Sequence, residues 1–111
     1  TNETEVEKYN TSKYCGYTFT TNGFINLYKL MIQAFKKNYQ VNNPNLKIFL
    51  IAGSDDPVIQ SKEKFNELKE FLSKIGYSNI KSKLYENMRH EILNETNNEL
   101  VYEDVLNFFD N

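Results

Sequence analysis

The sequence predicts an α/β fold, in which parallel strands are covered by helices on both faces of a sheet. Short apolar runs typical of strands alternate with longer amphipathic stretches typical of helices. The predicted order is helix, strand, helix, strand, helix, and its strand–helix–strand unit implies a right-handed crossover between parallel strands. Because two strands are too few to make such a sheet, we expect further strands before Thr1 or from another chain.

The first 45 residues are expected to hold one helix. Residues 1–20 are mostly polar, and Cys15–Thr20 is predicted to be irregular or briefly extended. Apolar side chains then recur at helical spacing, and Asn22 is a suitable cap, which predicts a helix over 23–38. Its apolar stripe is expected to pack in the core and comprises Phe24, Leu27, Tyr28, Met31, Ala34 and Phe35.

A strand is predicted after the turn residues Asn42–Asn45. Leu46–Ala52 is apolar apart from Lys47, which is typical of a strand buried on both faces in a parallel sheet. Gly53 is expected to end this strand. A new element must begin after the turn, because proline disfavours the helical conformation in the residue before it.

The remaining elements are a helix, an edge strand and a last helix. Ser61 opens the first of these helices and Gly76 supplies its left-handed stop. Residues 80–85 alternate between a lysine-bearing face and a less polar one, which predicts an edge strand protected by its charges. Asn97 or Asn98 is expected to cap the last helix, whose inward-facing side chains are predicted to be Val101, Val105, Phe108 and Phe109.

Composition excludes several classes of function. Thirteen basic and fifteen acidic residues give a net charge of −2, with no basic patch for nucleic acid. The apolar runs are far shorter than the roughly 20 residues that cross a bilayer. One cysteine and one histidine exclude an intrachain disulfide and a zinc site, so we expect no metal, no cofactor and a reducing, cytoplasmic setting.

The residues that carry chemistry follow the two predicted strands. Asp55 and Asp56 come after the first strand and His90 after the second, and sites in open α/β sheets form at these strand ends. A carboxylate beside a histidine orients the imidazole and stabilises its protonated form. Asp followed by His, 34 positions apart, matches the end of the chain order Ser, Asp, His.

The nucleophile of such a triad is missing from the sequence, which has no Gly-x-Ser-x-Gly turn. The segment around Ser78 imitates half of that turn, but it lacks the second glycine and joins a helix to a strand. Cys15 has no base placed beside it and is expected to be an ordinary thiol. Asp55 is expected to cap the turn or to form a hydrogen bond within it, and a Mg²⁺-binding or phospho-acceptor role is the weaker alternative.

Two motifs follow the predicted strands: Gly53-Ser-Asp-Asp56, followed by Pro57-Val58, and Arg89-His90-Glu91, leading to Asn94-Glu95. Both resemble motifs of α/β-hydrolases of the monoacylglycerol lipase and lysophospholipase group. The resemblance implies the C-terminal part of a three-layer sandwich, with Asp56 rather than Asp55 as the acid and His90 as the base. It also implies a lid-exit segment and connecting helix over 1–45 and a core portion over 46–111.

The function implied by the resemblance is serine hydrolysis of carboxylic esters of small lipids, by a triad whose serine lies outside this chain, so the chain alone is expected to be inactive. Its expected partners are a lipid ester or another small-molecule ester, the missing N-terminal part of the same fold and, by peripheral contact, a membrane surface. Val58 and Ile59 are expected to line an apolar substrate pocket or to pack in the core. The alternative is a non-catalytic binding or assembly module that keeps the fold and uses its apolar surface. If the missing half of the fold is absent, part of the apolar stripe of residues 23–38 is expected to be exposed and to drive self-association. Arg89 and Glu91 are expected to be solvated or to pair with neighbours.

Overall fold

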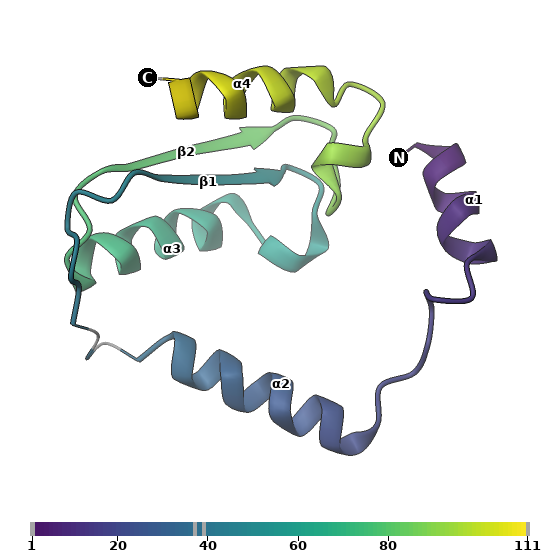
Figure 1. Ribbon diagram of the computed structural model, residues 1–111, viewed down its shortest axis with the longest axis horizontal. Helices are drawn as coiled ribbons and strands as arrows, with labels where there is room; N and C mark the ends of the chain where they lie inside the picture. Colours follow the sequence, from purple (N-terminus) through teal and green to yellow (C-terminus); the bar gives the residue numbers. More distant parts are fainter. Residues whose placement is uncertain (1, 37, 39, 111) are drawn as a thin grey trace.

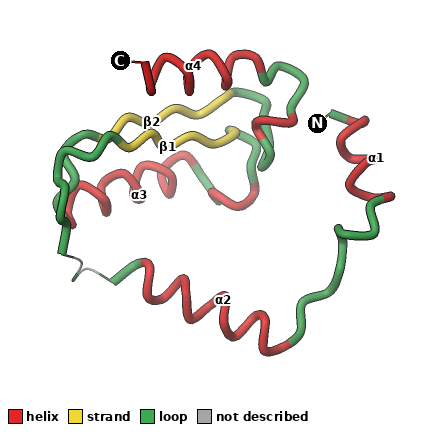
Figure 2. The backbone as a smooth tube through the Cα atoms, viewed as in Figure 1, coloured by secondary structure: helices red, strands yellow, loops and turns green. Residues whose placement is uncertain are grey.

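The computed structural model describes residues 2–36, 38 and 40–110. Figure 1 shows its elements in chain order, and Figure 2 shows the loops that join them. The elements are α1 (Glu3–Thr11), α2 (Thr21–Ala34), β1 (Ile48–Gly53), the 3-10 turn η1 (Pro57–Ile59), α3 (Lys62–Ile75), β2 (Ile80–Tyr85), the 3-10 turn η2 (Ile92–Asn94) and α4 (Glu99–Asp110).

The two strands form a parallel sheet between two helices. The register runs from Ile48 opposite Ile80 to Gly53 opposite Tyr85. Helix α3 covers one face of the sheet and α4 covers the other, which makes three layers (Figure 1). The predicted α/β class and the parallel crossover are therefore confirmed.

A small core lies under α4 at the end of the sheet. Val101 is fully buried, and Phe108 stacks on Phe49 of β1 with ring centroids 5.0 Å apart. The buried cluster comprises Tyr85, Met88, Ile92 and Val101. The prediction that Phe109 faces inward is wrong: its side chain is 76% exposed, because it lies about 80° around the helix from Val101 at 100° per residue.

The caps of α3 lie where the sequence places them. The Ser61 hydroxyl accepts a hydrogen bond from the Lys64 amide at 3.2 Å, and Gly76 adopts φ of 120° at the other end. Glycine tolerates this conformation, which strains other residues. Strand β1 begins at Ile48, two residues later than predicted, and its side chains are half-buried because the described residues cover it less completely than a full sheet would.

Helix α1 was not predicted, since most of its nine residues are polar and none of its side chains is buried. Local interactions favour it: Glu3 and Glu5 lie in the first turn, where negative charge is favourable, and Lys8 pairs with Glu5 at 2.5 Å. The segment 12–20 after it is irregular, as predicted for Cys15–Thr20.

Helix α2 begins at Thr21 and ends at Ala34, so the predicted range 23–38 is wrong at both ends. Thr20, not Asn22, is the cap, and its hydroxyl accepts a hydrogen bond from the Gly23 amide at 3.1 Å. Lys37, within the predicted range, lies outside the described residues. None of the helices in the described part of the chain is sufficiently long and apolar to cross a membrane.

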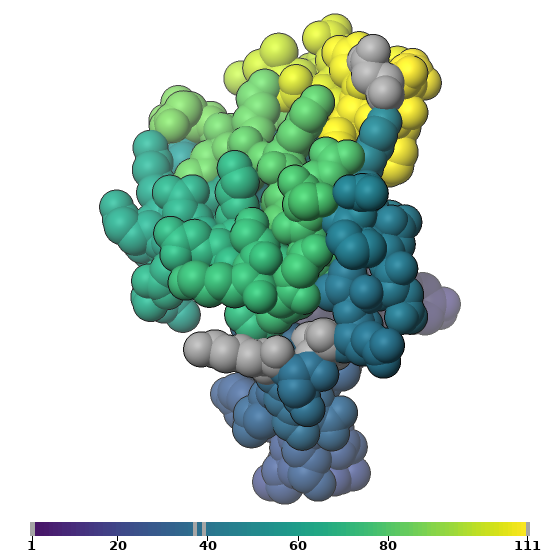
Figure 3. Space-filling view, turned by 90° about the vertical axis from the view of Figure 1, so that its left-hand side faces the viewer, coloured from purple at the N-terminus to yellow at the C-terminus, as the bar shows by residue number. Residues whose placement is uncertain are grey.

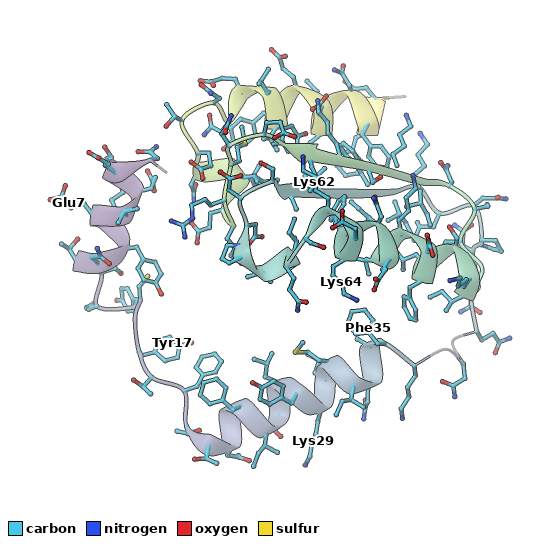
Figure 4. The ribbon with its side chains drawn as sticks, turned by 180° about the vertical axis from the view of Figure 1, so that it is seen from behind. Glu7, Tyr17, Lys29, Phe35, Lys62 and Lys64 are labelled. Carbon is cyan, nitrogen blue, oxygen red and sulfur yellow. The ribbon has the colours of Figure 1, made fainter. Side chains whose placement is uncertain are left out.

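The apolar side chains of α2 are exposed, so the prediction that its stripe packs in the core is wrong. Their exposed fractions run from 41% at Leu27 to 68% at Ile32. Figure 3 shows the helix projecting from the body formed by the sheet, α3 and α4. Its C-terminal end contacts that body, because the ring centroids of Phe35 and Phe71 lie 5.5 Å apart. Figure 4 shows Phe35 turned toward α3 and Lys29 turned away from it.

Candidate active site

The turns that follow β1 and β2 are joined to each other by backbone hydrogen bonds. The amide of Ser54 donates to the carbonyl of Tyr85 at 2.8 Å, and the amide of Asp55 donates to the carbonyl of Met88 at 2.9 Å. The amide of Asn87 donates to the Ser54 hydroxyl at 3.0 Å. These bonds fix the two loops against one another at the carboxyl ends of the strands, where α/β folds form their sites.

Gly53 makes this close approach possible. A Cβ atom at this position would lie 2.1 Å from the carbonyl oxygen of Met88 and 2.4 Å from that of Arg89. Both atoms belong to the backbone, so neither can move without shifting the whole loop. Gly53 therefore allows the loop that carries His90 to cross directly over the end of β1.

Asp56 and His90 meet at this crossing. His90 Nδ1 lies 2.9 Å from Asp56 Oδ2, although the residues are separated by 34 positions. The Asp56 side chain is 6% exposed and that of His90 is 65% exposed. The second ring nitrogen, Nε2, has no hydrogen-bond partner among the described residues. The imidazole is thus held on one side and open on the other.

The environment of Asp56 favours its ionised form. Burial, the largest influence, acts to raise the pKa of its carboxyl group. The hydrogen bonds from His90 and from the Val58 amide, together with the positive charges of His90 and Arg89, outweigh burial and lower the pKa below its ordinary value. Oδ1 accepts from the Val58 amide at 2.8 Å while Oδ2 meets the imidazole. The same carboxylate therefore caps η1 and orients His90.

The loop that carries His90 is anchored behind the imidazole. The buried carboxylate of Glu95 accepts a hydrogen bond from the Arg89 amide at 2.8 Å. The carbonyl of Leu93 accepts from Asn98 Nδ2 at 2.8 Å and from the Tyr102 hydroxyl at 2.9 Å. Sequence reasoning noted Glu95 only as part of a motif and did not predict Tyr102, because a tyrosine in an amphipathic helix gives no signal of a polar partner.

Comparison with known protein families agrees with this geometry. The family model described as "Serine aminopeptidase, S33" matches residues 1–97. The chain belongs to this serine aminopeptidase S33 family. No curated protein and no solved structure matches the chain. The match assigns the chain to the α/β hydrolases.

Asp55 and Ser78, the other candidate residues of this S33 family member, take no part in the Asp56–His90 contact. Asp55 is exposed and accepts a hydrogen bond from the Ser54 hydroxyl at 2.9 Å, which agrees with a role in the turn. Ser78 lies before β2, at the opposite end of the strand from His90, and its hydroxyl donates to the Pro44 carbonyl at 3.0 Å. Among the described residues, no group of three or more acidic, histidine or cysteine side chains could hold a metal ion.

A cavity of about 440 Å³ has His90 among its lining residues. Val6 and Tyr9 of α1 line it on one side, and Pro57 and His90 line it on the other. The sequence-predicted pocket residues Val58 and Ile59 are not among its lining residues, and Val58 is largely exposed. Their role in binding substrate stays a prediction. The contribution of α1 was missed because α1 itself was not predicted.

Proposed function

We propose that the chain supplies the acid and the base of a serine hydrolase that cleaves carboxylic esters of small lipids, of the lysophospholipase or monoacylglycerol lipase type. His90 is the general base and then the general acid, and Asp56 orients it. The nucleophilic serine belongs to a segment outside these 111 residues, and residues 1–45 form the exit from a lid and a connecting helix.

The observation that carries this proposal is the 2.9 Å contact between His90 Nδ1 and Asp56 Oδ2. A carboxylate at Nδ1 holds the proton on that nitrogen and leaves Nε2 to accept one from a serine hydroxyl. As the serine attacks the ester carbonyl, Asp56 stabilises the imidazolium that forms. His90 then gives the proton to the departing alcohol, which completes the acylation half of the reaction.

Two features favour a lipid ester over other acyl substrates. The motifs Gly53-Ser-Asp-Asp56 and Arg89-His90-Glu91 resemble those of the lipase group, and the cavity beside His90 has Val6, Tyr9 and Pro57 in its walls. The family description names an aminopeptidase, and a triad alone does not determine the substrate. Peptides are therefore the competing substrate class within the same chemistry.

Kinetics of adjacent aspartate variants test the proposal. In the longer protein that carries the serine, Asp56→Asn should lower kcat on a short-chain monoacylglycerol by roughly 10⁴-fold, because the imidazole loses its orienting carboxylate. Asp55→Asn is the matched control, since the Asp55 side chain is exposed and, among the described residues, accepts a hydrogen bond only from the neighbouring Ser54 hydroxyl, and it should change kcat by less than about threefold.

Three results would contradict parts of the proposal. Equal losses in the two variants would remove the distinction between Asp55 and Asp56, and full activity of Asp56→Asn would exclude Asp56 as the acid. Faster turnover of an amino-acid anilide than of the monoacylglycerol would assign the site to peptides. The two variants test the roles of Asp55 and Asp56, and the anilide tests the class of substrate.

The exposed apolar surface of α2 favours a second candidate function, a non-catalytic binding or assembly module. Its side chains from Phe24 to Phe35 are solvent-exposed in the described chain, and apolar patches of this kind mark interaction sites. Such a module would keep the hydrolase fold without a nucleophile. Labelling by a serine-directed probe separates this function from the enzymatic one, as described below.

A further inference from the structure

Helix α1 stands opposite the carboxyl ends of the two strands. In Figure 1 both strand arrows point toward the side of the molecule on which α1 lies, and the loop containing η2 occupies the same side. The cavity of about 440 Å³ lies between α1 and that loop, with His90 in its wall. A volume of this size is typical of sites that hold small molecules.

The charged residues in the cavity wall already have partners within the chain. Glu5 pairs with Lys8, Glu91 accepts a hydrogen bond from Asn94 Nδ2 at 2.8 Å, and Glu95 accepts from the Arg89 amide. The Arg89 guanidinium adds a positive charge near Asp56.

The apolar residues of the wall, in contrast, present surface to the cavity. Val6 and Tyr9 each keep about half of their surface exposed, and α1 buries neither of them against the body. They lie three positions apart and therefore share one face of the helix. Pro57 adds an apolar ring from the other side, next to Asp56. A ligand in this cavity would meet mainly apolar contacts.

We propose that Val6 and Tyr9 form the binding wall for the apolar, uncharged group of the ester whose carbonyl lies at His90. The inference rests on the proposed function and goes beyond it by assigning recognition to α1. Because the wall carries the carboxylates of Glu5, Glu91 and Glu95 against one arginine, the site should take a neutral acyl group and disfavour a free carboxylate.

Matched valine and tyrosine variants test this assignment by binding, independently of turnover. The probe is monohexanoylglycerol, titrated into the chain and followed by the NMR shifts of backbone amides and valine methyl groups, with hexanoate and glycerol as controls. Val6→Ser and Tyr9→Ala should each weaken binding by roughly fivefold or more. Leu100→Ser and Tyr14→Ala replace residues that are at least as exposed and do not line the cavity, and binding to these variants should stay within about twofold of the wild type.

The wild-type titration keeps the inference testable even if a variant loses α1. The Val6 methyl groups should shift with monohexanoylglycerol and not with glycerol, and hexanoate should bind more weakly than the ester. The inference is overturned if the ester does not bind, if Leu100→Ser weakens binding while Val6→Ser does not, or if all four variants bind alike. In the longer protein that carries the serine, ester binding that survives in Asp56→Asn while turnover is lost would keep this test separate from that of the proposed function.

Discussion

The two parts of the chain differ in what covers their apolar side chains. From Ile48 onward, strands and helices enclose one another, and all of the buried residues among those described lie at Gly53 or later. Between residues 2 and 36, two well-formed helices bury no side chain at all, although α2 is the more apolar of the pair. Both parts therefore have regular secondary structure, but only the second has a core.

The difference shows that a helix can form from local interactions, whereas the candidate active site needs packed tertiary structure. Caps and local pairs, such as Thr20 with Gly23 and Lys8 with Glu5, suffice to define a helix. The Asp56–His90 contact requires two loops from separate strands to stay in fixed positions. The packed cluster that includes Val101 and Met88 holds them there. The site consequently lies on the packed part, and α1 contributes only a wall of its cavity.

The largest difference between the two parts is expected from alanine substitutions at glycines. Gly53→Ala places a methyl group 2.1 Å from the Met88 carbonyl, so the loop carrying His90 must move. We expect the free energy of unfolding to fall by about 3 kcal/mol, measured by urea denaturation followed by circular dichroism. The Asp56–His90 contact should be lost with it, seen as a changed imidazole signal in NMR.

The control for that substitution is Gly23→Ala in α2. Its new methyl group would meet Thr20 Oγ1 at 3.4 Å, an ordinary contact, and alanine favours a helix over glycine by up to about 1 kcal/mol. The free energy of unfolding should therefore stay the same or rise. Similar losses at both glycines would show that the two parts are not packed differently.

A smaller difference is expected from truncating apolar side chains. Val101→Ala leaves a cavity in the core and should cost about 2 kcal/mol, because the side chain is completely buried. Leu30→Ala removes a larger side chain from the exposed surface of α2 and should cost less than about 0.5 kcal/mol. Urea denaturation of the two variants measures both. A greater loss for Leu30→Ala would mean that α2 is covered in solution.

The smallest expected effect is on acid stability. Because the pKa of Asp56 is lowered in the folded chain, the unfolded chain binds its proton at a higher pH, and stability rises with pH through the interval below the ordinary value of 3.8. This contribution is present above that value and is lost as pH falls through the folded pKa. Asp56→Asn should therefore lose less stability than the wild type between about pH 5 and about pH 3. An identical loss of stability with falling pH in both proteins would contradict the role of the Asp56 carboxylate.

The fold could be predicted where packing and local signals agree. The strand run at residues 46–52, the Ser61 cap and the Gly76 stop each carry a signal that tertiary contacts reinforce, so α3 and the parallel pair were correct. The start of α2 was misplaced because Thr20 and Asn22 are both good caps and local spacing does not choose between them. Helix α1 was missed because it has no apolar periodicity, the main signal by which helices are recognised.

The candidate site was predictable in part. Strand order and the placement of Asp56 and His90 at strand ends predicted that the two would meet, which the 2.9 Å contact agrees with, while their catalytic role stays a prediction. The contacts that hold the loop were not predictable, since Glu95 and Tyr102 act through a backbone amide and a carbonyl that no motif specifies. The clash that makes Gly53 necessary involves residues 35 and 36 positions away and is visible only in three dimensions.

The measurement that tests the central claim most directly is labelling by a fluorophosphonate probe, which reacts with a serine activated by a neighbouring histidine. The longer protein carrying the proposed nucleophile should be labelled, its His90→Ala variant should not, and the 111-residue chain by itself should stay unlabelled. Absence of labelling in the longer protein would favour the binding module. Undiminished labelling of His90→Ala, or labelling of the 111-residue chain, would contradict the assignment of His90 and Asp56 as the base and acid of a triad completed from elsewhere.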